Sequence, residues 1–304
     1  MNTENGFDVI GLGCVCWDIV GTVDRYPALD EKERLNELIQ QGGGQAATAM
    51  VAVARLGGRC AIWGRVSDDE FGDKNIAQFQ AEGVDTQHLQ VLPGGASQFA
   101  FCVAEAGSGH RSIFWKHGSV GKLEPTDLDR AALLRCKCLL VDGHHIAAAI
   151  QAAEWAREAG IPVVLDMERP QPENEKLLQV CDYPILPEVY AIAHSGLPDV
   201  IEAGRKLHEH LGRLVIITCG DKGALAFNKG EVLHQPAFEV QPVIDTTGAG
   251  DVYHGAFAYG LTLGYDLVEN MRFSAAAAAL KCRALGGRTG IPTFEQARRL
   301  AADG

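Results

Sequence analysis

One seven-residue run combines what phosphoryl transfer requires of a protein, Asp245-Thr246-Thr247-Gly248-Ala249-Gly250-Asp251. Its small residues let backbone N–H groups approach an anion, and a carboxylate follows one step further on. Val243 and Ile244 before it predict the end of a strand, and the apolar spacing over 252–263 predicts a helix that the run opens. The unpaired amides and the dipole of a helix start stabilise negative charge on a moving phosphate. Asp251, in the first turn, is placed to accept the proton of an attacking hydroxyl.

A plainer interpretation of this run is a glycine-rich turn in which an aspartate starts the helix. Two Asp, two Thr and two Gly in seven residues, at a predicted strand-to-helix junction, favour the chemical interpretation. The working hypothesis is therefore a general base beside an amide-lined anion site.

The second half of the chain alternates short apolar runs with helical patterns. The apolar runs are 138–141, 163–166, 184–186 and 214–218, and the helical patterns are 147–159, 173–180, 200–211, 250–263, 267–280 and 294–302. Short continuous apolar strands that alternate with helices predict a mainly parallel sheet covered on both faces. A hairpin of 224–227 with 232–240 is predicted beside this sheet.

The first half of the chain predicts a smaller β piece attached to the same sheet. A strand at 8–13, a helix at 46–56, a strand at 61–66 and a helix at 71–80 belong to the main body. Alternating segments near 19–23 and 35–39, and a hairpin of 99–105 with 111–115, expose one face each. The fold class is α/β: one domain over residues 1–304, with a β lid built from about 19–40 and 98–116, suited to cover a ligand or to form a dimer.

Composition narrows the classes of partner. The 304 residues carry 27 Lys plus Arg against 39 Asp plus Glu, a formal charge of −12, which argues against a nucleic-acid or anionic-membrane surface. The first residues are polar and no stretch is long and apolar enough to span a bilayer, so a cytoplasmic location is expected. The nine cysteines, with Cys14-x-Cys16 and Cys136-x-Cys138 on strand-like segments, are expected to be reduced and buried.

The motifs and their order resemble the ribokinase-like carbohydrate kinases, also called the B-type phosphofructokinase family, over nearly the whole chain. The resemblance implies a three-layer fold with a small β-sheet lid and ATP-dependent phosphorylation of a sugar, with Mg²⁺ bound to the nucleotide. It carries the role of catalytic base to Asp251, and the anion hole to Gly248, Ala249 and Gly250. In such kinases the lid covers the sugar and often pairs between subunits, which implies a homodimer.

The substrate half of the site is predicted near the end of the first strand. Asp18 follows that strand, where ligands of open parallel sheets bind, and a carboxylate suits two neighbouring sugar hydroxyls; on its own it fits a surface turn equally well. The family has a sugar-binding Asp at this position. Gly43 and Gly44 match its Gly-Gly pair, and the family's sugar-binding Asn falls on Thr48, which has only a hydroxyl. Lys32 lies in a charged lid segment and matches a basic substrate contact.

The nucleotide half is predicted from two glycine-rich segments. Thr218, Gly220 and Gly223 match the family's Thr-x-Gly-x-x-Gly, which lines the ATP phosphate and ribose region, although a turn alone also explains them. Gly287, after a later helix, is expected on the adenine side. The family's Asn-x-x-Glu, which organises water around Mg²⁺, is absent in register, and Glu188 is the only acid nearby.

Asp245 and Thr247 match positions that line a monovalent-cation site in some relatives, which implies K⁺. Other details resemble the sulfofructose kinases within the family: the Gly-rich opening at 42–49, the segment 234–238 and the segment 280–292. The expected substrate is a ketose or a ketose derivative, either sulfofructose-like or fructose-like.

Several alternatives stay open at this point. Lys116, His144 and His145 follow strands where a substrate tail would lie, but a histidine there is more often only a satisfied polar residue. Ribose or a nucleoside is an alternative substrate. A catalytically weak sugar or nucleotide sensor on the same fold is the alternative to an enzyme, and the absent Asn-x-x-Glu motivates it.

Overall fold

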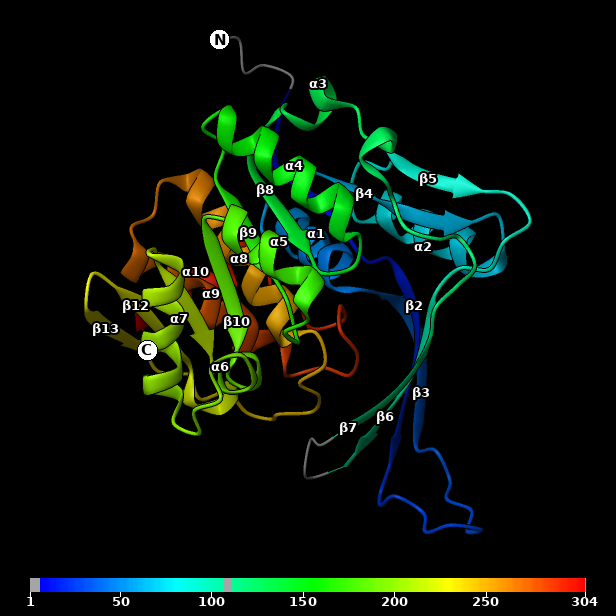
Figure 1. The fold of residues 1–304 in the computed structure, drawn as a ribbon. Coiled ribbons are helices and arrows are strands. Elements are labelled where there is room, and N and C mark those ends of the chain that lie inside the picture. Colours follow the sequence, from blue (N-terminus) through cyan, green and yellow to red (C-terminus); the bar gives the residue numbers. More distant parts are fainter. Residues whose placement is uncertain (1–5, 107–110, 304) are drawn as a thin grey trace.

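The computed structural model describes residues 6–106 and 111–303. In these residues a nine-stranded sheet is flanked by helices, and a separate four-stranded sheet projects from one side (Figure 1). The large sheet has the order β13-β12-β11-β10-β9-β8-β1-β4-β5. Its strands are β1 (Phe7–Leu12), β4 (Cys60–Ser67), β5 (Leu89–Leu92), β8 (Cys136–Asp142), β9 (Val163–Asp166), β10 (Tyr183–Pro187), β11 (Val215–Thr218), β12 (Ala224–Asn228) and β13 (Glu231–Gln235).

The large sheet is parallel from β5 to β11, and β12 and β13 add an antiparallel edge. The predicted mainly parallel sheet is therefore confirmed. Its α-helices are α1 (Gln45–Arg55), α2 (Glu70–Ala81), α3 (Arg130–Leu133), α4 (Ile146–Glu158), α5 (Glu175–Val180), α6 (Glu188–Ser195), α7 (Val200–Leu211), α8 (Ala249–Leu263), α9 (Leu267–Lys281) and α10 (Phe294–Asp303). Three further turns, 125–127, 172–174 and 220–222, are 3₁₀ helices.

Burial on both faces explains why the strands have continuous apolar sequences. Along β8, Leu140 faces a core shared with α1 and α8, whereas Leu139 and Val141 face a second core shared with α4 and α7. Successive side chains of a strand point to opposite faces, so where both faces are covered by helices, consecutive positions are apolar. The carboxyl ends of these parallel strands meet at one edge, which is where the site residues gather.

The small sheet has the order β3-β2-β6-β7 and forms the predicted lid (Figure 1). Its strands are β2 (Cys16–Val23), β3 (Glu37–Gly43), β6 (Phe99–Glu105) and β7 (Arg111–Lys116). The predicted turn between β6 and β7 lies outside the described residues at 107–110. All nine cysteines are free and buried, as expected.

One predicted strand end is wrong. Val243 and Ile244 belong to no strand, and their side chains are about half exposed. The amides of Ile244 and Asp245 both donate to the carbonyl of Cys282, just after α9, so this segment is fixed by a helix end and not by the sheet. The sequence pattern also missed β5 and α6. Within the described ranges, no helix is both long and apolar enough to cross a membrane.

Candidate active site

The run at 245–251 opens α8 as predicted, and Gly248 is its N-cap residue. Gly248 has φ 75°, a left-handed conformation that favours glycine, and a Cβ there would lie 2.8 Å from the Cα of Gly287. The Ala249 amide donates to the carbonyl of Thr246. Over 6–106 and 111–303, the amides of Gly248, Gly250 and Asp251 have no protein acceptor. Three of the four amides over 248–251 are thus free to bind an anion, including those of Gly248 and Gly250 from the predicted anion hole.

The Asp251 carboxylate has no hydrogen-bond or ion-pair partner among the described residues, and it is partly exposed. Burial raises its pKa well above the ordinary value, and the negative charges of Asp166 and Glu168 raise it further. His254 opposes this shift in part. A carboxylate without a partner and with a raised pKa is a better proton acceptor than an ordinary aspartate, which suits a general base.

His254, one turn after Asp251, is a site residue that sequence reasoning missed. Its Nδ1 lies 2.7 Å from the carbonyl of Gly250 and its Nε2 lies 2.8 Å from the carbonyl of Ile185 in β10. Nδ1 is also 3.3 Å from Asp166 Oδ2 at the end of β9. The buried ring therefore fixes the start of α8 against the edge of the sheet. The one sequence feature that could have indicated His254 is its position three residues after Asp251, on the same side of the predicted helix.

Asp142, at the end of β8, organises the loop that follows β1. Its Oδ2 accepts from the amides of Cys14 (2.7 Å) and Ala46 (3.2 Å), and its Oδ1 accepts from the amide of His144. A Cβ at Gly13 would overlap this carboxylate, so glycine is required there. Burial raises the pKa of Asp142 to about 6 although these amides favour its ionised form. Sequence reasoning missed Asp142 because its partners are distant in the chain.

Asp18 lies on β2 in a closely packed environment, 9% exposed. A Cβ at Gly43 would overlap its carboxylate, and one at Gly44 would overlap the carbonyl of Cys14, so both predicted glycines permit close packing around it. Burial raises the pKa of Asp18, and the buried guanidinium of Arg288 opposes that shift. The negative charge of Asp18 also adds to the raised pKa of Asp251, after the larger effects of burial, Asp166 and Glu168.

The inner face of the lid follows from strand register. Asp18 pairs with Ala100 across β2 and β6, and Ala100 pairs with Trp115 across β6 and β7, so these three side chains share a face. Trp115 is 59% exposed on that face, which makes it a candidate substrate contact that the sequence pattern did not single out. Arg111, on the same face of β7, donates to Thr246 Oγ1 over 2.9 Å. The lid is thus tied directly to the phosphoryl-transfer run.

One lysine and a group of histidines lie next to Asp142 and Cys14. Lys122 is exposed, and its Nζ lies 3.2 Å from both ring nitrogens of His144. No carboxylate of the described residues forms an ion pair with it. Burial and the Lys122 charge lower the pKa of His144 to about 3, so this ring is neutral. Burial raises the pKa of the Cys14 thiol. The negative charges of Asp142, Asp18 and Asp251 raise it further, and the charge of Lys122 opposes them. We call Lys122, His117 and His144 the cationic corner of the site.

Other predicted substrate residues lie elsewhere. Thr48 is 1% exposed, and its hydroxyl accepts from Arg288 Nε over 3.4 Å. Lys32 is exposed in the loop between β2 and β3. Figure 1 shows this loop at the end of the lid away from the large sheet. Lys116 is exposed at the end of β7, and His145 is buried with Nδ1 accepting from the amide of Leu123. Substrate contact by any of these residues stays a prediction.

The predicted nucleotide residues lie at the end of β11. Thr218 ends the strand, Gly220 and Gly223 bound the 3₁₀ turn with positive φ, and the Cys219 amide donates to the carbonyl of Gly223. Glu188, at the start of α6, has a carboxylate oxygen 3.8 Å from Lys222 Nζ. Gly287 packs against Gly248 at the phosphoryl-transfer run. These groups share the carboxyl edge of the sheet with Asp142 and Asp166.

A model of the pfkB family carbohydrate kinases matches residues 8–294. The chain belongs to that family. It is therefore a carbohydrate kinase with the ribokinase fold, and the predicted family and fold are confirmed. It is 27% identical over 299 residues to the ketohexokinase of Mus musculus, with 93% of this chain and 98% of that protein covered.

Solved structures agree with this fold. A putative ribokinase from Agrobacterium tumefaciens superposes with a TM-score of 0.91 at 28% identity, covering 98% of each chain. A putative ribokinase II from E. coli, solved in complex with ATP and Mg²⁺, superposes with a TM-score of 0.82 at 24% identity, covering 98% of this chain and 99% of that one.

Proposed function

We propose that this carbohydrate kinase transfers the terminal phosphoryl group of ATP to a hydroxyl of a ketose, with Asp251 as general base. The observation that carries this is the Asp251 carboxylate without a protein partner, next to free amides at Gly248 and Gly250. Asp251 takes the proton of the sugar hydroxyl as the new O–P bond forms, and the amides stabilise charge on the transferring group. A sensor that only binds sugar or nucleotide has no need of an unpaired general base such as Asp251, so an enzyme is favoured over that alternative.

ATP and Mg²⁺ fit the donor groups present. The free amides suit phosphate oxygens, and Thr218, Gly220, Gly223 and Gly287 stay the proposed nucleotide contacts. Asp166 Oδ2 is buried without a hydrogen bond, and the Asp251 carboxylate is also unpaired, so hard oxygen ligands are available at this edge. Mg²⁺ needs one or two carboxylates besides phosphates and water, and when bound it neutralises phosphate charge. The E. coli neighbour's bound ATP and Mg²⁺ support the same pair here.

The substrate end supports a sugar that carries an anionic group. Asp18 is placed to accept hydrogen bonds from two hydroxyls, and the exposed face of Trp115 suits packing against a sugar ring. Lys122, without a carboxylate partner, supplies one positive charge beside neutral His144. A sulfofructose-like ketose fits this corner better than fructose, because its sulfonate can form a charge-assisted hydrogen bond with the exposed ammonium of Lys122.

A coupled assay of ADP release tests the function with fructose, ribose, a ketose phosphate and a ketose sulfonate. Turnover with an anionic ketose is expected, and no turnover with any sugar would overturn the kinase proposal. Lys122→Met is expected to lower kcat/KM for the anionic ketose about 10- to 100-fold, the worth of a charge-assisted contact, and to change that for fructose little. Equal losses for both sugars would contradict the anionic substrate and leave the kinase proposal intact. Lys137→Met, on an exposed lysine of β8, is the matched control.

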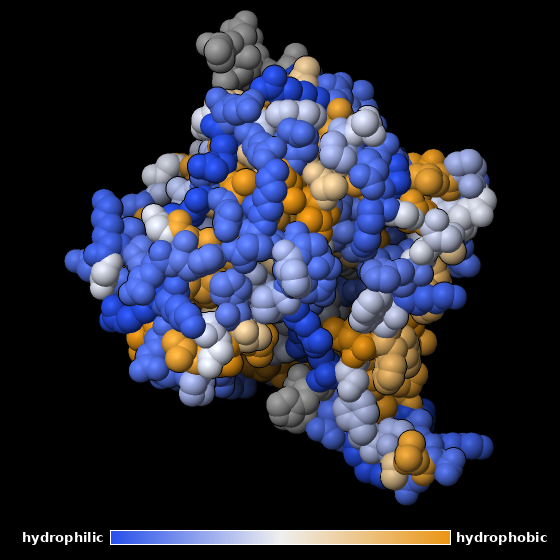
Figure 2. Space-filling view, in the orientation of Figure 1, coloured by the Kyte–Doolittle hydropathy of each residue, from blue (hydrophilic) through white to orange (hydrophobic). Residues whose placement is uncertain are grey.

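We also propose that the outer face of the lid pairs with a second copy of the chain. Ile19, Phe101 and Phe114 share that face by register, and Phe114 is 64% exposed. Figure 2 shows hydrophobic side chains gathered over the strands of the lid, as a dimer surface requires. Phe114→Asp should convert a dimer to a monomer in light scattering, whereas Val91→Asp on β5 should not. A wild-type monomer at micromolar concentration would contradict this.

A further inference from the structure

Lys281, the last residue of α9, is a fully buried cation behind the phosphoryl-transfer run. None of its surface is exposed, and its Nζ donates to the backbone carbonyl of Asp245 over 2.7 Å. Burial lowers the pKa of Lys281, and the negative charges of Asp245 and Asp251 oppose that effect. A buried ammonium is costly unless it compensates a local negative charge, so its position calls for a specific explanation.

The resemblance to ribokinase-like enzymes implies a monovalent cation at Asp245 and Thr247, but the residues present do not fit one. The carbonyl of Asp245 already accepts from Lys281, its Oδ1 accepts from the amide of Thr247, and its Oδ2 accepts from the amide of Gly286, each over 2.7–2.8 Å. Of the oxygens in the predicted pair of side chains, only the buried Thr247 hydroxyl lacks a hydrogen bond. A dehydrated alkali cation needs a shell of several oxygens, and one hydroxyl does not supply it.

We propose that the ammonium of Lys281 takes the place of that monovalent cation, so that catalysis in this chain does not depend on K⁺. An ammonium has the same charge as K⁺ and binds the same kind of oxygen. It holds the carbonyl of Asp245 three residues before Gly248, and so fixes the segment that leads into the anion hole. Because the ammonium is covalently attached, it cannot dissociate at low salt. The kinetic consequence rests on the proposed kinase function, whereas the cation-binding consequence does not.

The wild-type protein tests this directly. Activity measured with tetramethylammonium as the only monovalent cation should be within about fivefold of that in KCl, below the 5- to 150-fold range typical of a linked effector. In a crystal soaked with Rb⁺, no anomalous peak should lie at Asp245. Activation by K⁺ of more than about fivefold, or a Rb⁺ peak at Asp245, would overturn the proposal. The Rb⁺ result stands even if the sugar assays detect no turnover.

A lysine variant separates the proposed role from simple packing. Lys281→Met keeps an unbranched side chain of similar length, and it should lose activity at low salt and recover part of it in K⁺ or ammonium chloride. Lys206→Met is the matched control. Lys206 Nζ also donates to a backbone carbonyl, that of Ser195, over 2.8 Å, but Lys206 is exposed in the middle of α7. A folded Lys281→Met protein with full activity and no cation response would contradict the proposal. If the variant does not fold, the wild-type measurements decide.

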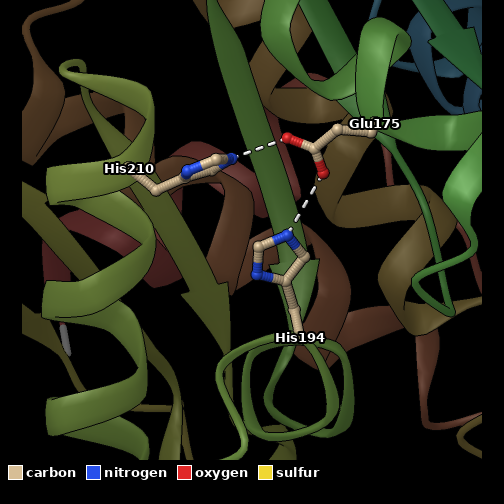
Figure 3. Close-up of side chains that lie close together, drawn as sticks. All are labelled: Glu175, His194 and His210. Atoms are coloured by element: carbon tan, nitrogen blue, oxygen red, sulfur yellow. Dashed lines mark hydrogen bonds and ion pairs between the residues drawn. The ribbon is translucent and has the colours of Figure 1, made fainter.

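A second and independent observation concerns α5, α6 and α7. Glu175, His194 and His210, one from the end of each helix, direct their side chains toward one point (Figure 3). His210 Nε2 lies 2.6 Å from Glu175 Oε1, and His194 Nε2 lies 3.3 Å from Oε2. The three ligand atoms lie within 4.8 Å of one another. His194 is held in place by stacking on the buried ring of Tyr190.

We infer that this cluster binds a divalent transition metal such as Zn²⁺, with water as the fourth ligand. Two imidazoles and one carboxylate around an open position are a usual ligand set for Zn²⁺. Gln179 Nε2 donates to Glu175 Oε1 over 3.1 Å and so orients the carboxylate from behind. The bound ion would add a metal link between three helices that the hydrogen bonds of Glu175 already connect.

Cobalt is the probe, because tetrahedral Co²⁺ absorbs visible light. Chelator-treated protein should take up one equivalent of Co²⁺ with a d–d band that Zn²⁺ displaces. His210→Gln should abolish the band, and Glu175→Gln, which removes the charged ligand, should weaken Co²⁺ binding by more than the roughly 10- to 100-fold typical of losing an outer-shell partner. His117→Gln, which alters the separate histidine group of the cationic corner, should leave it unchanged. No band in the wild type, or a band that persists in His210→Gln, would overturn the inference.

Discussion

Asp245 and Asp251 lie in one seven-residue run but in opposite environments. Both oxygens of the Asp245 carboxylate accept backbone amides, and its carbonyl accepts Lys281. Burial acts to raise the pKa of Asp245, but Lys281 and the amide of Thr247 outweigh it and hold the pKa below the ordinary value. The carboxylate of Asp251 has no partner in the described chain, and its pKa is raised.

The difference shows how one motif divides structure from chemistry. A carboxylate whose two oxygens each accept a backbone amide is stabilised as an anion, so it takes up a proton less readily than a carboxylate without such bonds. A carboxylate without bonds keeps that capacity, at a cost in stability that the rest of the fold offsets. Asp245 therefore stabilises the run, and Asp251 is left to react.

The largest effect should follow from Asp251→Asn. Removing the base should lower kcat by about 10²–10⁴ and leave KM for the sugar nearly unchanged. Because Asp251 forms no protein bonds, the melting temperature should not fall. Steady-state kinetics and thermal denaturation together check this. A kcat within a few-fold of wild type would show that another group takes the proton.

Asp245→Asn should show the reverse pattern, which is a clear loss of stability with a smaller loss of kcat than Asp251→Asn. An amide side chain has one acceptor oxygen, so one of the two buried amides loses its partner, and the free energy of unfolding should fall by about 1–3 kcal/mol. Chemical denaturation measures this, with Asp303→Asn at an exposed position as the control. An unchanged stability together with a kcat loss as large as that of Asp251→Asn would remove the contrast between the two acids.

Acid titration of stability sharpens the same contrast. The pKa of Asp245 is lowered below 3.8, so its ionised form stabilises the fold above that pH, and this contribution disappears as the pH falls through the folded-state pKa. The stability difference between wild type and Asp245→Asn should therefore be constant near neutral pH and shrink below about 3.8. Denaturation curves at several pH values test this, and a difference that grows in acid would contradict it.

The smallest predicted effect concerns the charge next to Asp251. Glu168 is exposed after β9 and raises the pKa of Asp251. Glu168→Gln should move the acidic limb of the kcat/KM profile to lower pH by a fraction of a unit, since exposed charges are screened by solvent. Glu173→Gln, at a nearby exposed acid, is the control. A shift to higher pH would mean that Asp251 does not set the limb.

Local sequence was sufficient to predict the start of α8 at the run 245–251 and most of the fold. The amides and Asp251 are contiguous in the chain, so their spacing alone predicts their geometry, and continuous apolar runs predict the parallel strands. Asp142, Asp166 and Trp115 were missed because their roles arise from strands that only the tertiary fold brings together. The apolar pair Val243 and Ile244 imitates a strand end, whereas bonds to the carbonyl of Cys282 fix it.

The central claim is that Asp251 and the free amides of α8 act on one reacting group. A crystal structure with the sugar substrate and a non-hydrolysable ATP analogue tests it most directly. The terminal phosphate should contact the amides of Gly250 and Asp251, and the acceptor hydroxyl should lie within hydrogen-bond distance of the Asp251 carboxylate. A terminal phosphate bound away from the start of α8, or a sugar hydroxyl directed at a different base, would contradict the account.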